Sequence, residues 1–195
     1  EIVPNGTLGS ETDCLNSITM GALDMAKVSA SVLGNFEPEW NVVSVPYVFN
    51  DKDHFYKVMD GEIAQDLYGL TEKDGFIGLT WLESGARSFY TANTPIRTPA
   101  DLNGLKIRTM ANEIHLEAWK AMGANPTPMA FGELFTAMQQ GTVDGQENPL
   151  GIITGNKFEE IEKFCTLTEH VYTPYYVVMN LEKWNSLTAE QQDAL

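Results

Sequence analysis

The sequence predicts an α/β fold with a largely parallel sheet, because strand-like and helix-like segments alternate along its 195 residues. Two patterns support this prediction. Apolar residues recur at helical spacing in several segments, and short runs rich in β-branched residues lie between them. With 43% apolar residues, a chain of this length can bury a substantial core.

The first half of the chain predicts two helices and two strands. Apolar residues at helical spacing within 13–25 predict a helix that ends near Gly21. The mostly apolar run 42–49 predicts a buried strand or extended segment. An aspartate at 51 or 53 caps a helix that continues to about residue 70, and residues 76–82 predict the next strand.

The alternation restarts after Gly85, where we place a domain boundary. A strand at 87–91 leads into a loop rich in Pro and Thr, and a strand at 105–110 follows. Asn112 then caps a helix that ends at Gly123. The remaining predicted elements are a helix over 132–140, a very short strand at 143–145, an amphipathic segment at 156–164 and an extended run over 170–180.

The two ends of the sequence predict a piece of a longer protein. The first ten residues are polar and rich in Gly, and they do not begin with Met. The last residues lie in a helix that has only just begun, since Thr188 and Gln191 have the spacing of a capping box.

The charge balance excludes two classes of partner. Acidic residues outnumber basic ones 27 to 12, which gives a formal net charge of −15. A surface this negative repels nucleic-acid phosphates and anionic lipid, so we expect no nucleic-acid partner. No apolar run approaches the roughly 18 residues that a membrane-spanning helix needs.

The sequence predicts no metal, no cofactor and no nucleophilic catalysis. It has no paired Cys or His at metal-ligand spacing, no P-loop, no G-x-G-x-x-G at a helix start and no G-x-S-x-G. Cys14 and Cys165 are either two free thiols or a long-range disulfide. Asp144 and Glu147, three residues apart, are the one possible acid/base pair, although carboxylates at this spacing more often form a turn and a solvated face.

The distribution of arginine is unusual, because all three arginines lie between residues 87 and 108. Arginine grips a carboxylate through two parallel hydrogen bonds and stays charged when it is buried. Arg108 lies in a strand-like segment, Arg87 begins a strand with aromatic neighbours, and Arg97 lies in an exposed loop. The pattern indicates either an anion site for a small organic acid or ordinary salt bridges in an acidic protein.

Several ordered motifs resemble one known family. They are Gly104–Arg108, Met122–Met129, Glu133–Gly141 and Val143–Pro149, with upstream support from Leu8–Ser10, Met20–Met25, Val45–Phe49 and Gly85–Arg87. Together they resemble the solute-binding proteins of tripartite ATP-independent periplasmic (TRAP) transporters over essentially the whole chain.

The resemblance implies a two-lobed periplasmic-binding-protein-like fold with a ligand cleft between the lobes. It assigns residues 1–85 to an N-terminal lobe that lacks its first strand and helix. Residues 86–173 form the second lobe, and 174–195 are a truncated return to the first. It also implies capture of a small organic acid in the periplasm and its delivery to the TRAP membrane subunits, by a binding protein and not an enzyme.

The resemblance also implies roles for individual residues. Arg108 matches the family's signature arginine, which bridges the ligand carboxylate, and Arg87 matches a second carboxylate contact. Asn148 supports the same carboxylate, and Phe131 falls where the family has a pocket aromatic. The remaining candidates are Ser29 and Glu11, which match first-lobe positions at the far end of the ligand, and Trp81, which lies on a strand just before Arg87.

The ligand class stays open at this stage. A uronate or aldonate, a C4-dicarboxylate, a sialic acid and a 2-oxo acid all carry the required carboxylate. The polar and aromatic first-lobe candidates favour a sugar acid or a dicarboxylate. The competing hypotheses are an enzyme on a similar two-lobed scaffold that uses Asp144 and Glu147, and a carboxylate sensor.

Overall fold

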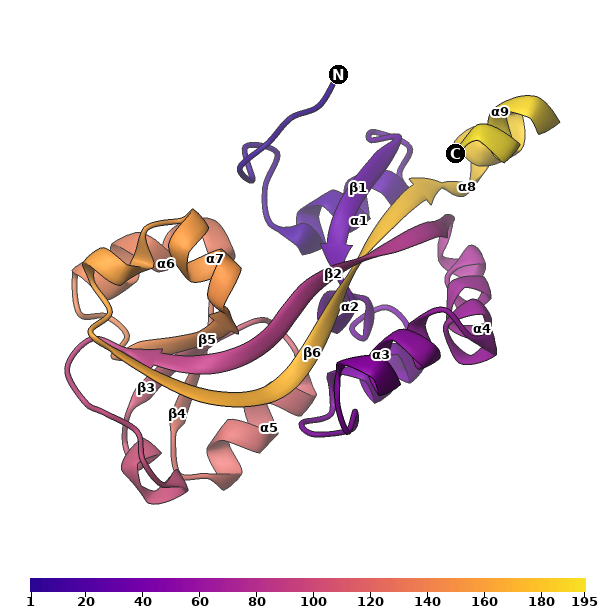
Figure 1. Cartoon of the computed structure of the whole chain (residues 1–195). Helices are drawn as coiled ribbons and strands as arrows, with labels where there is room; N and C mark the ends of the chain where they lie inside the picture. The colour runs from indigo at the N-terminus through magenta and orange to yellow at the C-terminus, as the bar shows by residue number, and fades with distance from the viewer.

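Two long strands, β2 and β6, run through the whole molecule, and the other strands and the helices are arranged along them. The computed structural model describes residues 1–195, and its sheet has six strands in the order β1-β6-β2-β5-β3-β4. The strands are β1 (Met25–Ser29), β2 (Phe76–Thr91), β3 (Lys106–Thr109), β4 (Asn125–Pro128), β5 (Gly145–Pro149) and β6 (Phe164–Asn180). Figure 1 shows β2 and β6 side by side, curving from one group of helices to the other.

Helices gather at both ends of these strands. The α-helices are α1 (Glu11–Thr19), α2 (Ala30–Leu33), α3 (Lys52–Met59), α4 (Glu62–Leu70), α5 (Glu113–Ala121), α6 (Phe131–Gln139), α7 (Leu150–Gly155), α8 (Leu181–Ser186) and α9 (Ala189–Ala194). The short 3-10 helices are η1 (Pro38–Ser44), η2 (Glu72–Asp74), η3 (Pro99–Leu102) and η4 (Phe158–Glu160). None of the helices is long and apolar enough to cross a membrane.

The hydrophobic core, like the helices, is divided between the two ends of β2 and β6. One cluster of 16 buried apolar residues, among them Trp40 and Tyr176, lies among α1–α4, β1 and the adjoining ends of β2 and β6. Two smaller clusters, of 7 and 6 residues, lie around Leu134 and Trp119 at the other end. We call residues 1–85 with 174–195 the first lobe and residues 86–173 the second lobe. Their division at these residues stays a prediction.

The predicted α/β class is confirmed, but the predicted parallel sheet is wrong. Strand β6 is antiparallel to both β1 and β2, and β2 is antiparallel to β5. The only parallel pairs are β3 with β4 and β3 with β5. The alternation of strands and helices along the sequence does not show this direction of pairing. The reason is that β2 and β6 each pass from one lobe to the other as a single strand, with no crossover helix within either of them.

Three predicted elements differ from the observed ones. Residues 42–49 form no strand, because η1 and the turns after it occupy this segment, and Tyr47 has a positive φ of 58°. The helix predicted over residues 51–70 is two helices separated at Gly61. Gly85 lies inside the continuous strand β2, at a register shift between Glu83 and Ala86, with a φ of +99°. A glycine tolerates this φ, so the strand bends there without ending.

The predictions that rest on local capping chemistry are confirmed. The side chains of Asp51 and Asn112 cap α3 and α5, and Thr188 and Gln191 form the capping box of α9.

Cys14 and Cys165 are both free thiols, which is one of the two alternatives that the sequence leaves open.

Candidate functional site

Arg108 is a buried arginine without an acidic partner. It lies on β3, between β5 and β4 in the sheet, and is only 3% exposed. Its Nε and Nη2 both donate to the carbonyl oxygen of Met129, at 3.0 and 2.7 Å, while Nη1 has no partner in the chain. No carboxylate lies within ion-pair distance of this guanidinium. Burial, together with the positive charge of Arg87, lowers the pKa of Arg108 to about 10. The structure thus holds a fixed and uncompensated positive charge.

Arg87 has an internal partner instead. Its Nε forms an ion pair with Oε2 of Glu147, and its Nη2 donates to Oε1 of the same carboxylate at 3.0 Å. Arg87 and Glu147 are 1% and 0% exposed. The salt-bridge alternative therefore describes Arg87, and a ligand contact through its remaining Nη1 stays a prediction. Of the two buried arginines, only Arg108 offers a guanidinium that no ion pair neutralises.

Glu147 is locked in place by two basic side chains. His170, on β6, approaches Oε2 of Glu147 with its Nε2 at 3.4 Å and Thr168 with its Nδ1 at 2.7 Å. Burial alone would raise the pKa of Glu147, but the charge of Arg87 and the hydrogen bond from His170 outweigh it and lower this pKa. The carboxylate is held ionised.

The two carboxylates of the enzyme hypothesis do not form an acid/base pair. Glu147 is committed to Arg87, and Oδ2 of Asp144 accepts a hydrogen bond from the backbone N of Lys106 at 2.8 Å. A general acid needs a pKa raised towards neutrality, and Glu147 has the opposite shift. Both carboxylates are structural. No group of three His, Cys, Asp or Glu side chains could hold a metal ion either.

Two amide side chains lie beside Arg108 on the same face of the sheet. Gln146 is the direct neighbour of Arg108 in the parallel β3–β5 register, and Asn148 follows two residues later. Both are buried, at 0% and 4% exposed, and Nδ2 of Asn148 donates to Oε1 of Gln146. Nε2 of Gln146 is buried without a partner. The predicted residue Asn148 is therefore next to Arg108, and Gln146 joins it.

Phe131 borders the same site from above the sheet. It is the first residue of α6, 42% exposed, and its ring centroid lies 5.9 Å from Cζ of Arg108. The ring also packs edge-on against Phe158, which fixes its orientation. An exposed aromatic face beside a guanidinium suits the carbon skeleton of an organic acid.

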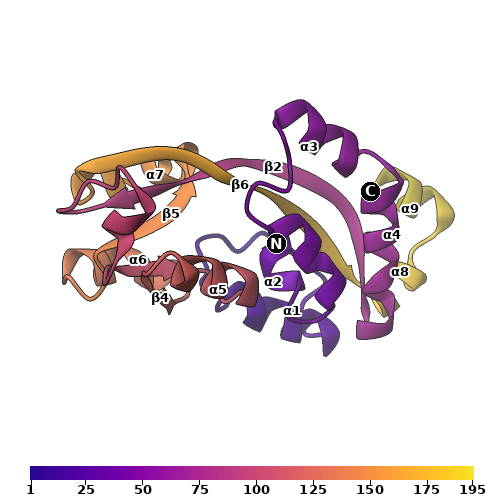
Figure 2. The same ribbon diagram turned by 90° about the horizontal axis from the view of Figure 1, so that it is seen from below.

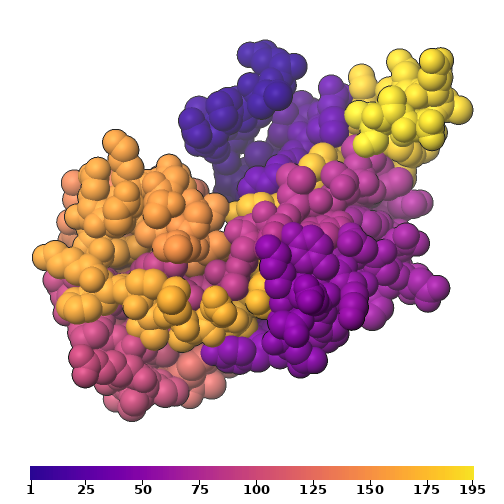
Figure 3. Space-filling model, in the orientation of Figure 1, coloured from indigo at the N-terminus to yellow at the C-terminus, as the bar shows by residue number.

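Glu11 and Ser29, the two predicted first-lobe contacts, lie together in the structure. Oε2 of Glu11 accepts a hydrogen bond from the backbone N of Ser29 at 3.0 Å, and Oε1 pairs with Nζ of Lys27 at 3.1 Å. The hydroxyl of Ser29 is buried and has no partner. The negative charge of Glu11 acts to raise the pKa of Arg108, which offsets part of the lowering caused by burial. Figure 3 shows a hollow in the surface between the indigo N-terminal residues and the orange helices of the second lobe.

Trp81 lies apart from this group, and its role as a ligand contact stays a prediction. Its Nε1 donates to Oδ1 of Asp60 at 3.0 Å, and its ring packs against Phe55 and Tyr56. Trp81 is paired with the fully buried Tyr176 in the β2–β6 register and faces the core of the first lobe. Trp81 precedes Arg87 closely along the chain, but β2 is bent by a register shift between the two residues. Closeness in sequence therefore does not place Trp81 beside Arg87.

Sequence reasoning did not single out four groups that contact or neighbour the predicted residues: the Met129 carbonyl, Gln146, His170 and Tyr175. Tyr175 pairs with Ser29 in the β1–β6 register, and its ring lies 3.7 Å from Nζ of Lys27. The one usable signal was in β5, where polar side chains at 146, 147 and 148 stand in a strand that is buried throughout.

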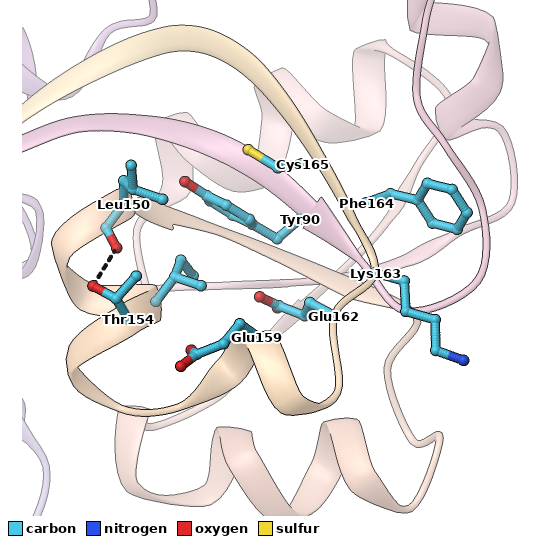
Figure 4. Close-up of a pocket in the computed structure, with 9 residues that line it drawn as sticks. Tyr90, Leu150, Thr154, Glu159, Glu162, Lys163, Phe164 and Cys165 are labelled. Carbon is cyan, nitrogen blue, oxygen red and sulfur yellow. Dashed lines mark hydrogen bonds between the residues drawn. The ribbon is translucent and has the colours of Figure 1, made fainter.

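A separate cavity of about 160 Å³ lies in the second lobe between β2, α7, η4 and the start of β6. Figure 4 shows Glu162 and Tyr90 among its lining, with the apolar Leu150 and Phe164 at its edges. Glu162 is 8% exposed, and both carboxylate oxygens lack a partner. Burial raises the pKa of Glu162 to about 7, and the negative charge of Glu159 acts in the same direction.

This raised pKa predicts a pH-dependent gain from the substitution Glu162→Gln. A raised carboxyl pKa stabilises the fold below the ordinary value of about 4.3, and this stability is lost as pH rises through about 7. The variant should therefore be more stable than the parent at pH 8, by on the order of 1–3 kcal/mol, and no more stable at pH 4. Thermal unfolding at the two pH values measures the difference. The exposed control Glu117→Gln lies on α5, outside this cavity, and should change stability little at either pH. Equal behaviour of the two variants would contradict the assignment.

Comparison with known proteins identifies the family. The family described as "Bacterial extracellular solute-binding protein, family 7" matches residues 1–195. The chain belongs to this family. The predicted resemblance is thereby confirmed.

Three relatives of this family member are especially informative. A solute-binding protein of Verminephrobacter eiseniae is 43% identical over 97% of this chain and 57% of its own length. The 2,3-diketo-L-gulonate-binding periplasmic protein YiaO of Escherichia coli is 37% identical over 100% of this chain and 60% of its own. A TRAP periplasmic solute-binding protein of Polaromonas, solved with D-erythronate, is 43% identical and matches 99% of this chain and 64% of its own with a TM-score of 0.96. The chain thus spans about three fifths of the length of the relatives it matches, and the two-lobed fold is confirmed by the solved relative.

Proposed function

We propose that this chain forms the binding site of a periplasmic solute-binding protein, which captures a small organic acid and delivers it to the membrane subunits of a TRAP transporter. The observation that carries the proposal is Arg108, a guanidinium that is 3% exposed, fixed by the Met129 carbonyl and unpaired with any acid. A buried charge without a partner is costly. A ligand carboxylate supplies the missing partner.

The surroundings of Arg108 suit this role. The buried amides of Gln146 and Asn148 can donate to a carboxylate that Arg108 holds, and the ring of Phe131 can contact its carbon skeleton. Arg87, neutralised by Glu147, stiffens the neighbouring strands. Because Arg108 lies in the second lobe and Glu11 and Ser29 in the first, ligand contacts to both lobes favour the closed arrangement. Removal of water then strengthens the ion pair.

We infer that the ligand is a hydroxylated monocarboxylate, such as an aldonate or a uronate. The first-lobe side of the site presents the carboxylate of Glu11 and the unpartnered hydroxyl of Ser29. A carboxylate accepts hydrogen bonds from hydroxyl groups but repels a second carboxylate. A C4-dicarboxylate would bring its second charge towards Glu11. The erythronate and diketo-gulonate named for the two relatives are hydroxylated acids of the favoured class.

A ligand panel tests the proposal. Thermal unfolding is measured with D-erythronate, D-galactonate, D-galacturonate, succinate and the uncharged sugar D-galactose. Binding to the folded state raises the melting temperature with ligand concentration. We expect a sugar acid to give the largest rise, succinate a smaller one and galactose none. A largest rise with galactose would overturn the carboxylate site, and a largest rise with succinate would overturn the assignment of ligand class.

A further inference from the structure

The two lobes touch at a polar seam beside the candidate site, formed by α2 and η1 of the first lobe and the start of α5 in the second. Figure 2 shows α5 next to α2 in the view from below. Asn35 donates from Nδ2 to the carbonyl oxygen of Ala111 at 2.6 Å, and Nε2 of His115 lies 3.1 Å from the carbonyl oxygen of Ser44.

Asn112 is the centre of this seam. Its Nδ2 donates to the carbonyl oxygen of Ser31 and to Oδ1 of Asn41, both at 2.8 Å and both in the first lobe. Its Oδ1 accepts a hydrogen bond from the backbone N of His115 at 3.0 Å, which caps α5 in the second lobe. The residue is 1% exposed, so these bonds are made away from water. One buried side chain therefore faces both lobes.

The first-lobe partners of Asn112 are themselves held in place. The hydroxyls of Ser44 and Ser31 are 3.0 Å apart in a buried hydrogen bond, which ties η1 to α2. Asn41 donates from Nδ2 to the carbonyl oxygen of Gly34 at 3.3 Å. A Cβ at Gly34 would collide with the Asn41 amide, so only glycine leaves room for this orientation. The acceptors that face Asn112 are therefore preorganised.

The position of Asn112 in the chain connects the seam to the candidate site. It follows Arg108 by four residues, and its partner Ser31 follows Ser29 by two. The bond from Asn112 to Ser31 thus joins the two segments that carry the carboxylate-binding residue and a first-lobe candidate contact. We propose that Asn112 is a positioning residue, which holds the two lobes in register and sets the separation between Arg108 and the first lobe.

Hydrogen bonds that exist only when the lobes are together shift the balance between open and closed arrangements. Loss of the two inter-lobe bonds of Asn112 should shift this balance about 10-fold towards the open arrangement. The effect on lobe separation holds without any ligand. Only the accompanying effect on affinity rests on the proposed function.

The experiment uses Asn112→Ser, which keeps an oxygen to cap α5 but removes the amide donors. The matched control is Asn180→Ser. Asn180 also caps a helix, α8, through its side-chain oxygen and donates from Nδ2 to the carbonyl oxygen of Ile18 at 2.8 Å, but all of its partners lie in the first lobe. A second test variant, Gly34→Ala, displaces Asn41 and weakens the seam from the other lobe without changing α5.

Spin labels on Asn16→Cys in α1 and Glu117→Cys in α5, in a background with Cys14→Ser and Cys165→Ser, report the distance between the lobes by pulsed electron paramagnetic resonance. We expect Asn112→Ser and Gly34→Ala to give longer or broader distance distributions than the parent without ligand, and Asn180→Ser to match the parent. With the best-binding acid of the panel, the first two variants should raise Kd about 10-fold, while the control should leave it unchanged.

Distance distributions for Asn112→Ser and Gly34→Ala that superimpose on the parent would overturn the proposal, as would an equal shift in Asn180→Ser. If Asn112→Ser does not fold, Gly34→Ala alone decides. If no acid binds to the parent, the proposed function fails, but the distances measured without ligand still decide the role of Asn112.

Discussion

Replacement of Arg108 by Met should abolish measurable binding of the organic acid while the protein stays as stable as the parent or becomes more stable. Truncation of one member of a buried, hydrogen-bonded charge pair costs roughly 2–5 kcal/mol, which is a loss of affinity of about 30-fold or more. Arg108 is the only unneutralised guanidinium at the site, and no other side chain replaces its two-pronged geometry.

The expected effect on stability has the opposite sign. Without ligand, Arg108 is a buried cation whose charge is not compensated, and its lowered pKa of about 10 reflects that cost. Met fills a similar volume without a charge, so the variant is relieved of the desolvation penalty. The substitution also removes the two hydrogen bonds that Arg108 donates to the Met129 carbonyl oxygen, and this opposes the gain only in part.

Calorimetric titration with the best acid of the panel, together with thermal unfolding, measures both effects. Arg97 is exposed and makes no side-chain ion pair, so Arg97→Met is the matched control and should bind as the parent does. Arg108→Lys keeps the charge but not the two-pronged fork, and should bind weakly. Equal affinities for the two Met variants would disprove the assignment of Arg108.

Replacement of Glu147 by Gln should destabilise the protein strongly, by about 3–5 kcal/mol. The substitution leaves the guanidinium of Arg87, 1% exposed, without its counter-charge and replaces the carboxylate that His170 contacts by a neutral amide. Arg87 and Arg108 are both buried arginines, yet we expect opposite consequences for stability. The reason is that one is paired inside the chain and the other is not.

Chemical unfolding of Glu147→Gln, Glu147→Leu, Arg87→Met and the double variant Arg87→Met with Glu147→Leu tests this contrast. The double variant should recover much of the lost stability, because an apolar pair of similar volume avoids burying any charge. The exposed pair Glu117–Lys120 provides the control, since Glu117→Gln should change stability by less than about 0.5 kcal/mol. Additive losses in the double variant would show that Arg87 and Glu147 are not coupled.

Local chemistry made part of this fold predictable. The caps at Asp51, Asn112 and Thr188 depend on residues only three positions apart, and all three are observed. Residues 42–49 show the limit of local reasoning. Their β-branched composition fits a strand, but they pair with no strand of the sheet, and they form η1 and turns.

The candidate site was predictable in composition but not in pairing. The clustering of arginines in a chain with three of them pointed to Arg108, and the family resemblance pointed to Asn148 and Phe131, which lie near it. The partner of Arg87 lies 60 residues away, on a strand that pairs antiparallel with β2. Spacing along the chain carries no information on such a contact. The antiparallel register of β2 and β5 decides which arginine is neutralised.

The uninterrupted course of β2 and β6 has a consequence for how the molecule comes apart. Each strand supplies backbone hydrogen bonds to both halves of the sheet. Neither half can therefore unfold without breaking backbone hydrogen bonds that the other half needs. Heat should therefore unfold the chain in a single cooperative transition, despite its two-part outline.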